Sequence, residues 1–506
     1  MTTPAIPSPV VWCVGGLDSS GGAGITRDIT TLTSLNIHAC AITTLLSAQS
    51  HTSMLRSECV TSNAFNAQWQ VLESDLTPNA IKIGALANDE QAHAICSNIQ
   101  RLSSPRPFIA WDPVFIASSG GHLSRQGSLT HTAITQLLRT VDVVTPNIDE
   151  LAALSRLPIT DSSSLVAAAQ QLISLGAKAV LVKGGHAHWQ DDMVDVLLTS
   201  EQIVYFTQST HNTALLRGTG CMLASACCGF VVKGYSLIDA LTLAIAYVRE
   251  TRSSALCSTG EYFVAGINGF PSNPDAFPHL TLCASTQING RVAPNINDDV
   301  SFPSLLNPNL GLYPVVDSVA WIKALLPTGI KVIQLRIKEG SQDEIREQIA
   351  KAVQLTKHSQ CQLFINDHWA LAIELGAYGV HLGQEDIETA DLDAIRKAGL
   401  RLGISTHGYA EIQRVKQLNP SYIALGHVFP TTTKVMPSKP QGLQRLANYV
   451  PLCGDIPTVA IGGITQSRIK PVKATGVKGI AVVTAITKAN DPLQACSALI
   501  QEVEHA

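Results

Sequence analysis

The sequence predicts an α/β protein of two domains, a layered domain built on a parallel sheet followed by a (β/α)₈ barrel. The length of 506 residues exceeds what one hydrophobic core can hold, because cores stop growing near ~250–300 residues. Apolar residues make up 45% of the chain and charged residues 15%, a balance typical of parallel sheets buried on both faces. Short apolar runs alternate with helical stretches throughout, which favours the α/β class.

Composition also excludes several classes of protein. The net charge of -4 argues against a nucleic-acid partner. The first residues lack the features of a secretory signal, and no apolar run reaches the ~18 residues of a membrane span. Twelve cysteines occur without a CxxC pair, so we expect reduced core cysteines with no disulfide and no zinc site. We therefore expect a cytoplasmic protein that acts on small molecules, either as a monomer or as a homo-oligomer.

Residues 1–270 are predicted to form the layered domain. Strand-like apolar runs alternate there with helical stretches, the pattern of a sheet covered on both faces. The runs are Val10 to Val14, Ala80 to Ile83, Phe108 to Trp111, Val141 to Thr145 and Ala179 to Val182. Residues 271–308 are rich in Pro, Asn, Ser and Asp without a sustained apolar period, which predicts a linker.

Residues 309–506 are predicted to form the barrel, a compact TIM barrel. Eight apolar runs, each followed by a helical or loop segment, match its eight strands. The runs read LGLYPVV, VIQLRI, LFIND, GVHLG, LGIST, YIALGHV, TVAIGGI and IAVVTAI. Catalytic groups of this fold gather at the carboxyl ends of the strands, so the polar residues after each run are the candidates for a site.

The predicted barrel rim carries the groups that a magnesium-bound pyrophosphate needs. Asp367 and Asp386 end adjacent runs, and paired carboxylates suit Mg²⁺, which keeps several waters and takes other ligands from phosphate. Arg336, Lys338 and Lys434 supply positive charge for a diphosphate. Gly462 and Gly463, with the small residues after the eighth run, match the usual phosphate cradle of backbone N–H groups. Other polar residues at these ends are Gln334, Asn366, His381, Gln384, Ser405, His407, Thr431 and Thr433.

The segment from about Leu310 to the C-terminus resembles the thiamine-phosphate synthase family. The similarity rests on QLRIK, FINDHWALA, YGVHLGQED, GISTH, HVFPTTTK and AIGGI, in that order. It implies that Asp367 and Asp386 bind Mg²⁺ and that Ser405 contacts the pyrimidine. It implies further contacts with the pyrimidine diphosphate from Gln334, Leu335, Arg336, Ile337, Lys338 and Asn366. It also implies a thiazole-phosphate site made of Thr431, Thr432, Thr433, Lys434, Gly463, Val483 and Thr484.

The chemistry of that family agrees with these residue types. Breaking the C–O bond to pyrophosphate leaves a cationic pyrimidine methylene, and the barrier falls when metal, arginine and lysine stabilise the departing negative charge. Arg336, Lys338 and Lys434 are the predicted catalytic residues. A thiazole tautomerase of the same fold would lack the paired aspartates and the basic residues, so their presence favours the synthase.

The layered domain contains two glycine-rich turns. GGLDSSGGAGITRD, Gly15 to Asp28, is a weak phosphate-loop signal because it has no GK[ST]. The stronger signal is Gly218, Thr219 and Gly220, which precede a helix whose free N–H groups and positive dipole form an anion hole. Asn147 and Glu150 are predicted to hold magnesium through water, and Lys183 to reach phosphates.

This domain resembles the ribokinase-like fold, and within it the hydroxymethylpyrimidine and phosphomethylpyrimidine kinases. The similarity rests on LDSSGGAG, KIGAL, DPVF, TPNIDE, VKGGH and GTGC. It implies ATP as co-substrate, Cys221 as the base, and Asp18 and Gln49 as contacts to the pyrimidine. Because Cys221 lies near the start of a predicted helix, we expect the helix dipole to lower the pKa of its thiol and so favour the thiolate. The chain departs from the family pattern at Ser19, Ala85 and Arg217, and at SAQSHTSM.

Together the two resemblances imply a bifunctional enzyme whose first domain makes the substrate of the second. One alternative is an active synthase with a degenerate first domain that only binds pyrimidine or mediates dimerisation. Another keeps kinase chemistry on a different small alcohol, such as a pyridoxal-like ring.

Overall fold

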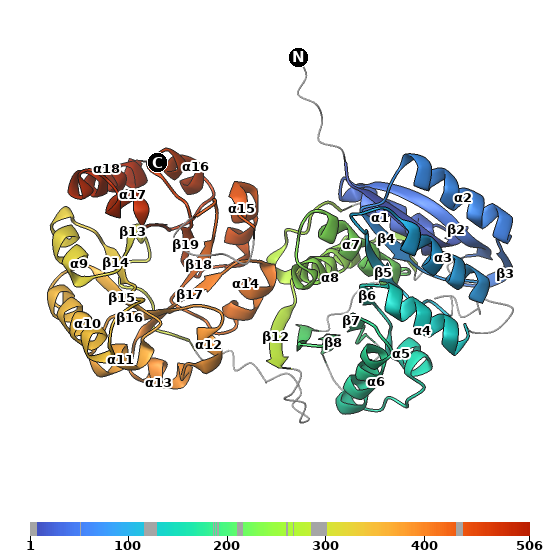
Figure 1. Cartoon of the computed structure of the whole chain (residues 1–506), viewed down its shortest axis with the longest axis horizontal. Helices are drawn as coiled ribbons and strands as arrows, with labels where there is room; N and C mark the ends of the chain where they lie inside the picture. Colours follow the sequence, from blue (N-terminus) through green and yellow to red (C-terminus); the bar gives the residue numbers. More distant parts are fainter. Residues whose placement is uncertain are drawn as a thin grey trace, which may run out of the picture. The chain divides into compact units, whose positions relative to one another are not determined.

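The computed structural model divides the chain into two compact units, Met1–Pro294 and Asn295–Ala506, which are coloured along the sequence in Figure 1. The structure describes residues 8–50, 52–115, 129–185, 187, 189, 192–209, 216–259, 262–266, 268–284, 301–431 and 439–505. Within these ranges, every helix is too short or too polar to cross a membrane.

The first unit is built on a sheet of ten strands, in the order β12-β9-β8-β7-β6-β5-β4-β1-β2-β3. Strands β2, β1, β4, β5, β6 and β7 are parallel, while β3 and the group β8, β9 and β12 form antiparallel edges. The bounds are β1 (Val10–Asp18), β2 (His38–Gln49), β3 (Met54–Cys59), β4 (Ala80–Ile83), β5 (Phe108–Trp111), β6 (Val143–Val144), β7 (Ala179–Val182), β8 (Met193–Thr199), β9 (Gln202–Gln208) and β12 (His279–Ala284). A separate pair joins β10 (Leu256–Thr259) to β11 (Tyr262–Val264).

Helices cover both faces of this sheet and give the three layers that were predicted. Successive strand residues point to opposite faces, so Trp12 and Val14 of β1 pack in the core with α2 to α6, while Lys82 of β4 reaches Asp28 of α1 on the other face. The helices are α1 (Gly24–Ser34), α2 (Ser62–Asp75), α3 (Asp89–Arg101), α4 (His131–Thr140), α5 (Ile148–Ser155), α6 (Ser162–Ser174), α7 (Thr219–Val232) and α8 (Leu237–Ser253).

A buried ion pair ties the sheet to the helices α1 and α7. Lys82 Nζ lies 3.0 Å from Asp28 Oδ2, and both side chains are buried. Ser225 of α7 donates to Asp28 Oδ1 at 2.6 Å. Removing two charges from water is costly unless each is paired and hydrogen-bonded, and this arrangement meets both conditions. It fixes α7, whose first residues form the predicted anion hole.

The structure places both ends of the predicted 271–308 linker inside the units. The 3₁₀ helix η1 (Pro274–Ala276) precedes β12, which pairs with β9 from His279 opposite Thr207. At the other end, Leu305 is buried in the core of the barrel. The alternating pattern of His279–Ala284 is a strand signal that the flanking Pro and Asn residues obscured. What remains of the linker, residues 285–300, lies outside the described residues.

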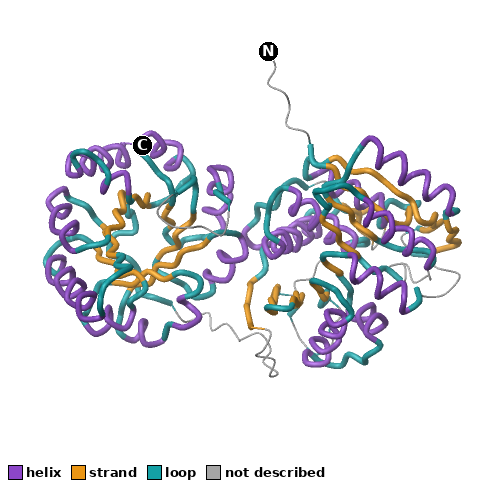
Figure 2. Tube along the Cα trace, viewed as in Figure 1, coloured by secondary structure: helices purple, strands orange, loops and turns teal. Residues whose placement is uncertain are grey.

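The second unit is a closed barrel of eight parallel strands, β13 to β20, which confirms the predicted fold. Each predicted run corresponds to one strand, and Figure 2 shows the strands as an inner ring surrounded by helices. The strands are β13 (Gly311–Val316), β14 (Val332–Leu335), β15 (Gln362–Asn366), β16 (Gly379–Leu382), β17 (Arg401–Thr406), β18 (Tyr422–Gly426), β19 (Thr458–Ile461) and β20 (Gly479–Val482). The helices are α9 (Val319–Leu325), η2 (Leu326–Thr328), α10 (Gln342–Thr356), α11 (Trp369–Glu374), α12 (Asp386–Thr389), α13 (Leu392–Lys397), α14 (Tyr409–Lys416), α15 (Gly442–Leu452), η3 (Gln466–Arg468), α16 (Ile469–Lys473), α17 (Thr484–Thr487) and α18 (Pro492–His505).

Aromatic side chains fill the interior of the barrel. Tyr313, Phe364 and Tyr422 are buried, and the ring centroids of Phe364 and Tyr422 lie 5.0 Å apart in an edge-on arrangement. A Cβ at Gly403 would come within 2.1 Å of the Tyr422 ring, so a glycine there makes room for the ring. The barrel is therefore a packed support, and its strand ends remain for chemistry.

Candidate active sites

The paired aspartates of the barrel meet at its rim. Asp367 follows β15 with a φ of 64°, and Asp386 begins α12, where its Oδ2 accepts from the N–H of Gly383 at 3.0 Å. Burial, and then the charge of Asp386, raise the pKa of Asp367, while Lys338 and Arg336 oppose that rise. Two carboxylates that repel each other in this way fit a divalent cation, because the cation would remove the repulsion.

Few protein ligands surround that position. No group of three or more His, Cys, Asp or Glu side chains suited to a metal occurs among the described residues. A cation held by two carboxylates must complete its coordination with water and phosphate oxygens, as Mg²⁺ usually does. Arg336 is half-buried and Lys338 is exposed at the end of β14, and both influence the charge of Asp367. The structure thus brings the expected metal ligands and two of the expected catalytic cations together.

A chain of buried hydrogen bonds links two predicted substrate contacts, Gln334 and Ser405. Gln334 donates to Tyr313 at 3.3 Å, and Tyr313 shares a 2.7 Å hydrogen bond with Tyr422. His381 bonds to Tyr422 through Nδ1 at 2.7 Å and to Ser405 through Nε2 at 2.8 Å. Burial, and then Arg336, lower the pKa of His381 to about 4, so the ring is neutral and orients the Ser405 hydroxyl. Sequence reasoning missed both tyrosines because they precede their strand ends.

The remaining predicted barrel contacts fall at the same end of the strands. Asn366 is buried as the last residue of β15, Leu335 ends β14, and Ile337 lies between the two basic residues. Val483 immediately precedes α17, which begins at Thr484. Thr431 is half-buried, whereas Thr432, Thr433 and Lys434 lie outside the described residues.

The predicted phosphate cradle is a tight turn after β19. Gly462 and Gly463 have φ values of 104° and 63°, a region that favours glycine. A Cβ at Gly463 would lie 2.4 Å from the carbonyl oxygen of Pro430. Arg468 donates to the Gly463 carbonyl, and its guanidinium lies 4.4 Å from the centre of the Phe429 ring. The turn is therefore fixed from both sides, with its N–H groups held in one arrangement.

Replacing Gly463 with alanine should raise the KM for a thiazole phosphate by about tenfold or more, because the turn must shift to relieve the contact with Pro430. Gly454 is a matched control. It has a φ of 60°, but a Cβ there would meet no atom within 4 Å. Gly454→Ala should carry only backbone strain and leave the KM unchanged. Steady-state kinetics of the two variants test this, and equal KM values would contradict a role for the turn.

In the first unit, Lys183 lies at the centre of a charged cluster near the start of α7. Its Nζ lies 2.7 Å from Asp112 Oδ1 and 3.6 Å from Glu150 Oε2. A Cβ at Gly220 would lie 3.1 Å from Lys183 Nζ, so the lysine reaches the predicted anion hole. Asp112 Oδ2 is buried without a hydrogen-bond partner among the described residues. An unpaired buried carboxylate oxygen next to a phosphate site fits a cation or its bound water.

Asn147 and Glu150 form the capping box that begins α5. The backbone N–H of Glu150 donates to Asn147 Oδ1 at 2.8 Å, and that of Asn147 donates to Glu150 Oε2 at 2.7 Å. These bonds fix the Glu150 carboxylate beside Lys183. Burial raises the pKa of Glu150 to about 7, with Lys183 lowering it and Asp112 raising it. The sequence pattern points to Asp112 only as part of the DPVF motif, although Asp112 too follows an apolar run.

The raised pKa of Glu150 predicts a stability that depends on pH. The folded state binds the proton more tightly than the unfolded state, so this contribution is complete below the ordinary pKa of 4.5 and is lost as pH rises through about 7. The free energy of unfolding of the first unit should therefore fall between about pH 5 and 8. Denaturant titrations of the wild type and Glu150→Gln test this, because the variant should lose that slope. An identical slope in both proteins would contradict the assignment.

The predicted anion hole is packed against the other glycine-rich turn. Gly218 has a φ of 72°, and a Cβ there would lie 2.2 Å from the carbonyl oxygen of Gly22, so only glycine allows this approach. Thr219 begins α7 and Gly220 follows it. Arg252 of α8 donates to Thr219 Oγ1 at 3.3 Å. The sequence alone does not single out Arg252, because it lies inside the next helix, 33 positions further along the chain.

Cys221 lies near the start of α7, as predicted, but its surroundings disfavour the thiolate. Burial raises its pKa to about 11, while Lys82 and a hydrogen bond from the backbone of Gly24 lower it. The expectation of a thiolate was wrong here, because the loss of water outweighs the helix dipole and the nearby cation.

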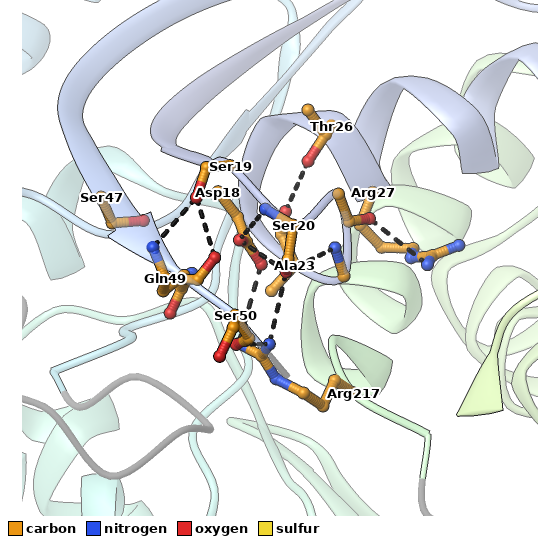
Figure 3. Close-up of polar contacts among 12 residues, drawn as sticks. Asp18, Ser19, Ser20, Ala23, Thr26, Arg27, Ser47, Gln49, Ser50 and Arg217 are labelled. Carbon is orange, nitrogen blue, oxygen red and sulfur yellow. Dashed lines mark hydrogen bonds and ion pairs between the residues drawn. The ribbon is translucent and has the colours of Figure 1, made fainter. Parts of the chain in front are cut away.

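The predicted pyrimidine contacts Asp18 and Gln49 end adjacent strands and are connected by short polar side chains (Figure 3). The Ser19 hydroxyl donates to the Gln49 carbonyl at 2.8 Å and accepts from the Gln49 N–H at 3.0 Å. Asp18 Oδ1 accepts from the backbone and the hydroxyl of Ser20, both at 2.8 Å. At Ala85, one of the departures from the family pattern, Met54 packs against the cluster of Leu45, Ala85 and Ala87.

Comparison with known proteins gives a family match for each of the two units. Residues 18–264 match the family model for phosphomethylpyrimidine kinase, and residues 312–486 match that for thiamine monophosphate synthase. A thiamine-phosphate synthase from Photorhabdus laumondii is 59% identical over 195 residues, which cover 38% of this chain and 90% of that protein. The structure of a pyridoxal kinase from Staphylococcus aureus aligns with 55% of this chain and with 99% of its own chain, at 21% identity and a TM-score of 0.48. The structure of a phosphomethylpyrimidine kinase from Clostridium difficile aligns with 48% of this chain and with 99% of its own chain, at 26% identity and a TM-score of 0.42.

The folds and the family matches define a transferase with two catalytic domains, one a layered α/β domain and one a TIM barrel. The chain belongs to the thiamine-phosphate synthase family, and it carries a phosphomethylpyrimidine kinase domain ahead of the synthase domain. It is thus a bifunctional enzyme of thiamine biosynthesis.

Proposed function

We propose that the first unit transfers phosphoryl groups from ATP to hydroxymethylpyrimidine and then to its monophosphate, and that the second unit joins the resulting diphosphate to thiazole phosphate. The products of the second reaction are thiamine phosphate and pyrophosphate. The observation that carries the proposal is the barrel rim, where two interacting aspartates feel the charges of two basic residues. That arrangement suits the release of pyrophosphate.

In the barrel, the proposed roles follow from position. Asp367 and Asp386 would hold Mg²⁺, which when bound neutralises the charge of the leaving pyrophosphate. Arg336 and Lys338 bind the same diphosphate. Gln334 and Ser405, which the buried tyrosine and histidine chain orients, hold the pyrimidine ring while its methylene becomes cationic. The turn at Gly463, with Thr431 to Lys434, Val483 and Thr484, binds thiazole phosphate so that its nitrogen faces that carbon.

In the first unit, the N–H groups of Gly218, Thr219 and Gly220 would receive the transferring phosphoryl group at the start of α7. Lys183 neutralises phosphate charge, and Asn147 and Glu150 would hold Mg²⁺ through water. Asp18 and Gln49 bind the pyrimidine, and Cys221 accepts the proton of the attacking hydroxyl. Burial favours the protonated thiol, so Cys221 must first lose its own proton to act as the base, and Lys82 and the backbone N–H of Gly24 favour the thiolate.

A first domain that only binds pyrimidine receives little support. The cluster of Lys183, Asp112 and Glu150 keeps charged groups buried at the phosphoryl site, which is costly for a domain without chemistry.

The enzyme is proposed to act in the cytoplasm, where ATP is available and cysteines stay reduced. The ten cysteines whose side chains are described are unpaired.

A coupled assay tests the whole proposal. The purified chain is given ATP, magnesium and hydroxymethylpyrimidine, and the monophosphate and diphosphate are separated by chromatography before thiazole phosphate is added. Both phosphates and then thiamine phosphate are expected. Synthase activity with supplied diphosphate but without any phosphorylation would refute the kinase half alone. Kinase activity on pyridoxal in place of hydroxymethylpyrimidine would change the substrate assignment.

Cys221→Ala should lower kcat for the phosphorylation of the hydroxymethyl group by about 100-fold, the usual contribution of a general base. Cys227→Ala is the matched control, because Cys227 is buried in the same helix six positions further along. The synthase rate of the same sample reports the concentration of folded protein. A full kinase rate in Cys221→Ala would remove this residue from the mechanism.

A further inference from the structure

Arg217 is a buried cation between the expected pyrimidine site and the anion hole. It directly precedes Gly218, and its side chain is 8% exposed. Figure 3 shows its guanidinium beneath the turn that follows β1. Nη1 donates to the carbonyl of Ser50 and, at 3.4 Å, to the hydroxyl of Ser20. Arg217 therefore joins the ends of β1 and β2 to the loop that begins α7.

The guanidinium is only partly satisfied. Its Nε and Nη2 have no hydrogen-bond partner among the described residues, and the same holds for Asp18 Oδ2. Arg217 Nη2 and Asp18 Oδ2 are 3.7 Å apart, which is an ion pair but too long for a good hydrogen bond. Buried charges left in this state are costly. They are better satisfied by a ligand that offers an acceptor to the arginine and a donor to the aspartate.

Gly22, in the turn that follows β1, lies beside these groups. A Cβ at Gly22 would lie 3.7 Å from both Arg217 Nη1 and Asp18 Oδ2. Because Gly22 has no side chain, its backbone can approach a bound molecule closely. An aminopyrimidine provides N–H donors for Asp18, and a phosphate on its hydroxymethyl carbon provides anionic oxygens for Arg217.

We propose that Arg217 binds the phosphate of the pyrimidine monophosphate and makes the kinase favour the second phosphorylation over the first. This inference rests on the proposed function of the first unit. In the second phosphorylation the acceptor is itself an anion, which meets the incoming phosphoryl group at the start of α7. The guanidinium of Arg217, two residues before the first residue of that helix, offsets the repulsion and orients the acceptor with two donors. The alcohol substrate offers no such charge.

The proposal is tested by measuring kcat/KM separately for the alcohol and the monophosphate in the full chain. Arg217→Gln should lower the ratio of the monophosphate value to the alcohol value by about 10- to 100-fold, as expected for lost hydrogen bonds to a charged group. Most of that loss should appear in KM for the monophosphate. Arg217→Lys should recover part of the ratio because it restores the charge. Arg101→Gln, an exposed arginine of the same unit, should leave the ratio at the wild-type value.

Calorimetric binding of the monophosphate without ATP gives a second readout, with a dissociation constant that rises in Arg217→Gln by a similar factor. An unchanged ratio would overturn the proposal, as would an equal fall for both substrates, which is the signature of a structural role. A wild-type chain that phosphorylates neither substrate would instead refute the proposed kinase function. The synthase rate of each sample confirms that the chain is intact.

Discussion

Asp367→Asn should abolish most of the synthase activity, with a fall in kcat/KM of about 1000-fold or more, while the kinase activity of the same chain is retained. The loss follows because one of the two carboxylates that would hold Mg²⁺ is removed and the leaving pyrophosphate keeps its charge. Asparagine is the appropriate replacement, because it tolerates the left-handed backbone of this position better than most residues. Release of pyrophosphate from supplied pyrimidine diphosphate measures the effect.

The same substitution should stabilise the metal-free barrel, although it removes synthase activity. Burial and Asp386 raise the pKa of Asp367, so without metal its ionised form destabilises the folded barrel at neutral pH. Asp367→Asn should therefore raise the melting temperature of the metal-free barrel. Magnesium should raise the melting temperature of the wild type more than that of the variant. A magnesium effect of equal size in both proteins would contradict the assignment of the metal site.

Lys183→Met should remove kinase activity by about 1000-fold or more and also destabilise the first unit by about 3 kcal/mol, because Asp112 and Glu150 would lose their shared counterion while staying buried. In the wild-type protein, burial raises the pKa of Asp112, but Lys183 and then Lys82 outweigh this effect and hold the pKa below its ordinary value. Denaturant unfolding and the ATP-dependent phosphorylation assay measure the two effects independently.

A double variant separates stability from catalysis. Adding Glu150→Gln to Lys183→Met removes one of the two uncompensated carboxylates, so the free energy of unfolding should recover in part. Kinase activity should not recover, because the cation that neutralises phosphate charge is still absent. Recovery of both would mean that Lys183 acts only through folding, and recovery of neither would mean that Glu150 and Lys183 are not coupled.

Much of the fold and many site positions could be predicted because they depend on local patterns. The eight apolar runs of the barrel gave its strands, and polar residues such as Asp367 and Asp386 were found by their place after those runs. Tyr422 and Arg252 could not be found in this way. Tyr422 reaches His381 from a strand two places further around the barrel, and Arg252 reaches Thr219 from the next helix.

The sequence by itself determined the two α/β units, the glycine-rich turn before α7 and the charged barrel rim, since strand periodicity and the chemistry of residues at strand ends are local properties. Only the tertiary structure decided the protonation of Cys221, the strand inside the expected linker, and the pairing of Arg217 with Asp18. Burial, sheet pairing and long-range ion pairs decide these features. They depend on segments brought together by folding, and 199 positions separate Asp18 from Arg217 in the chain.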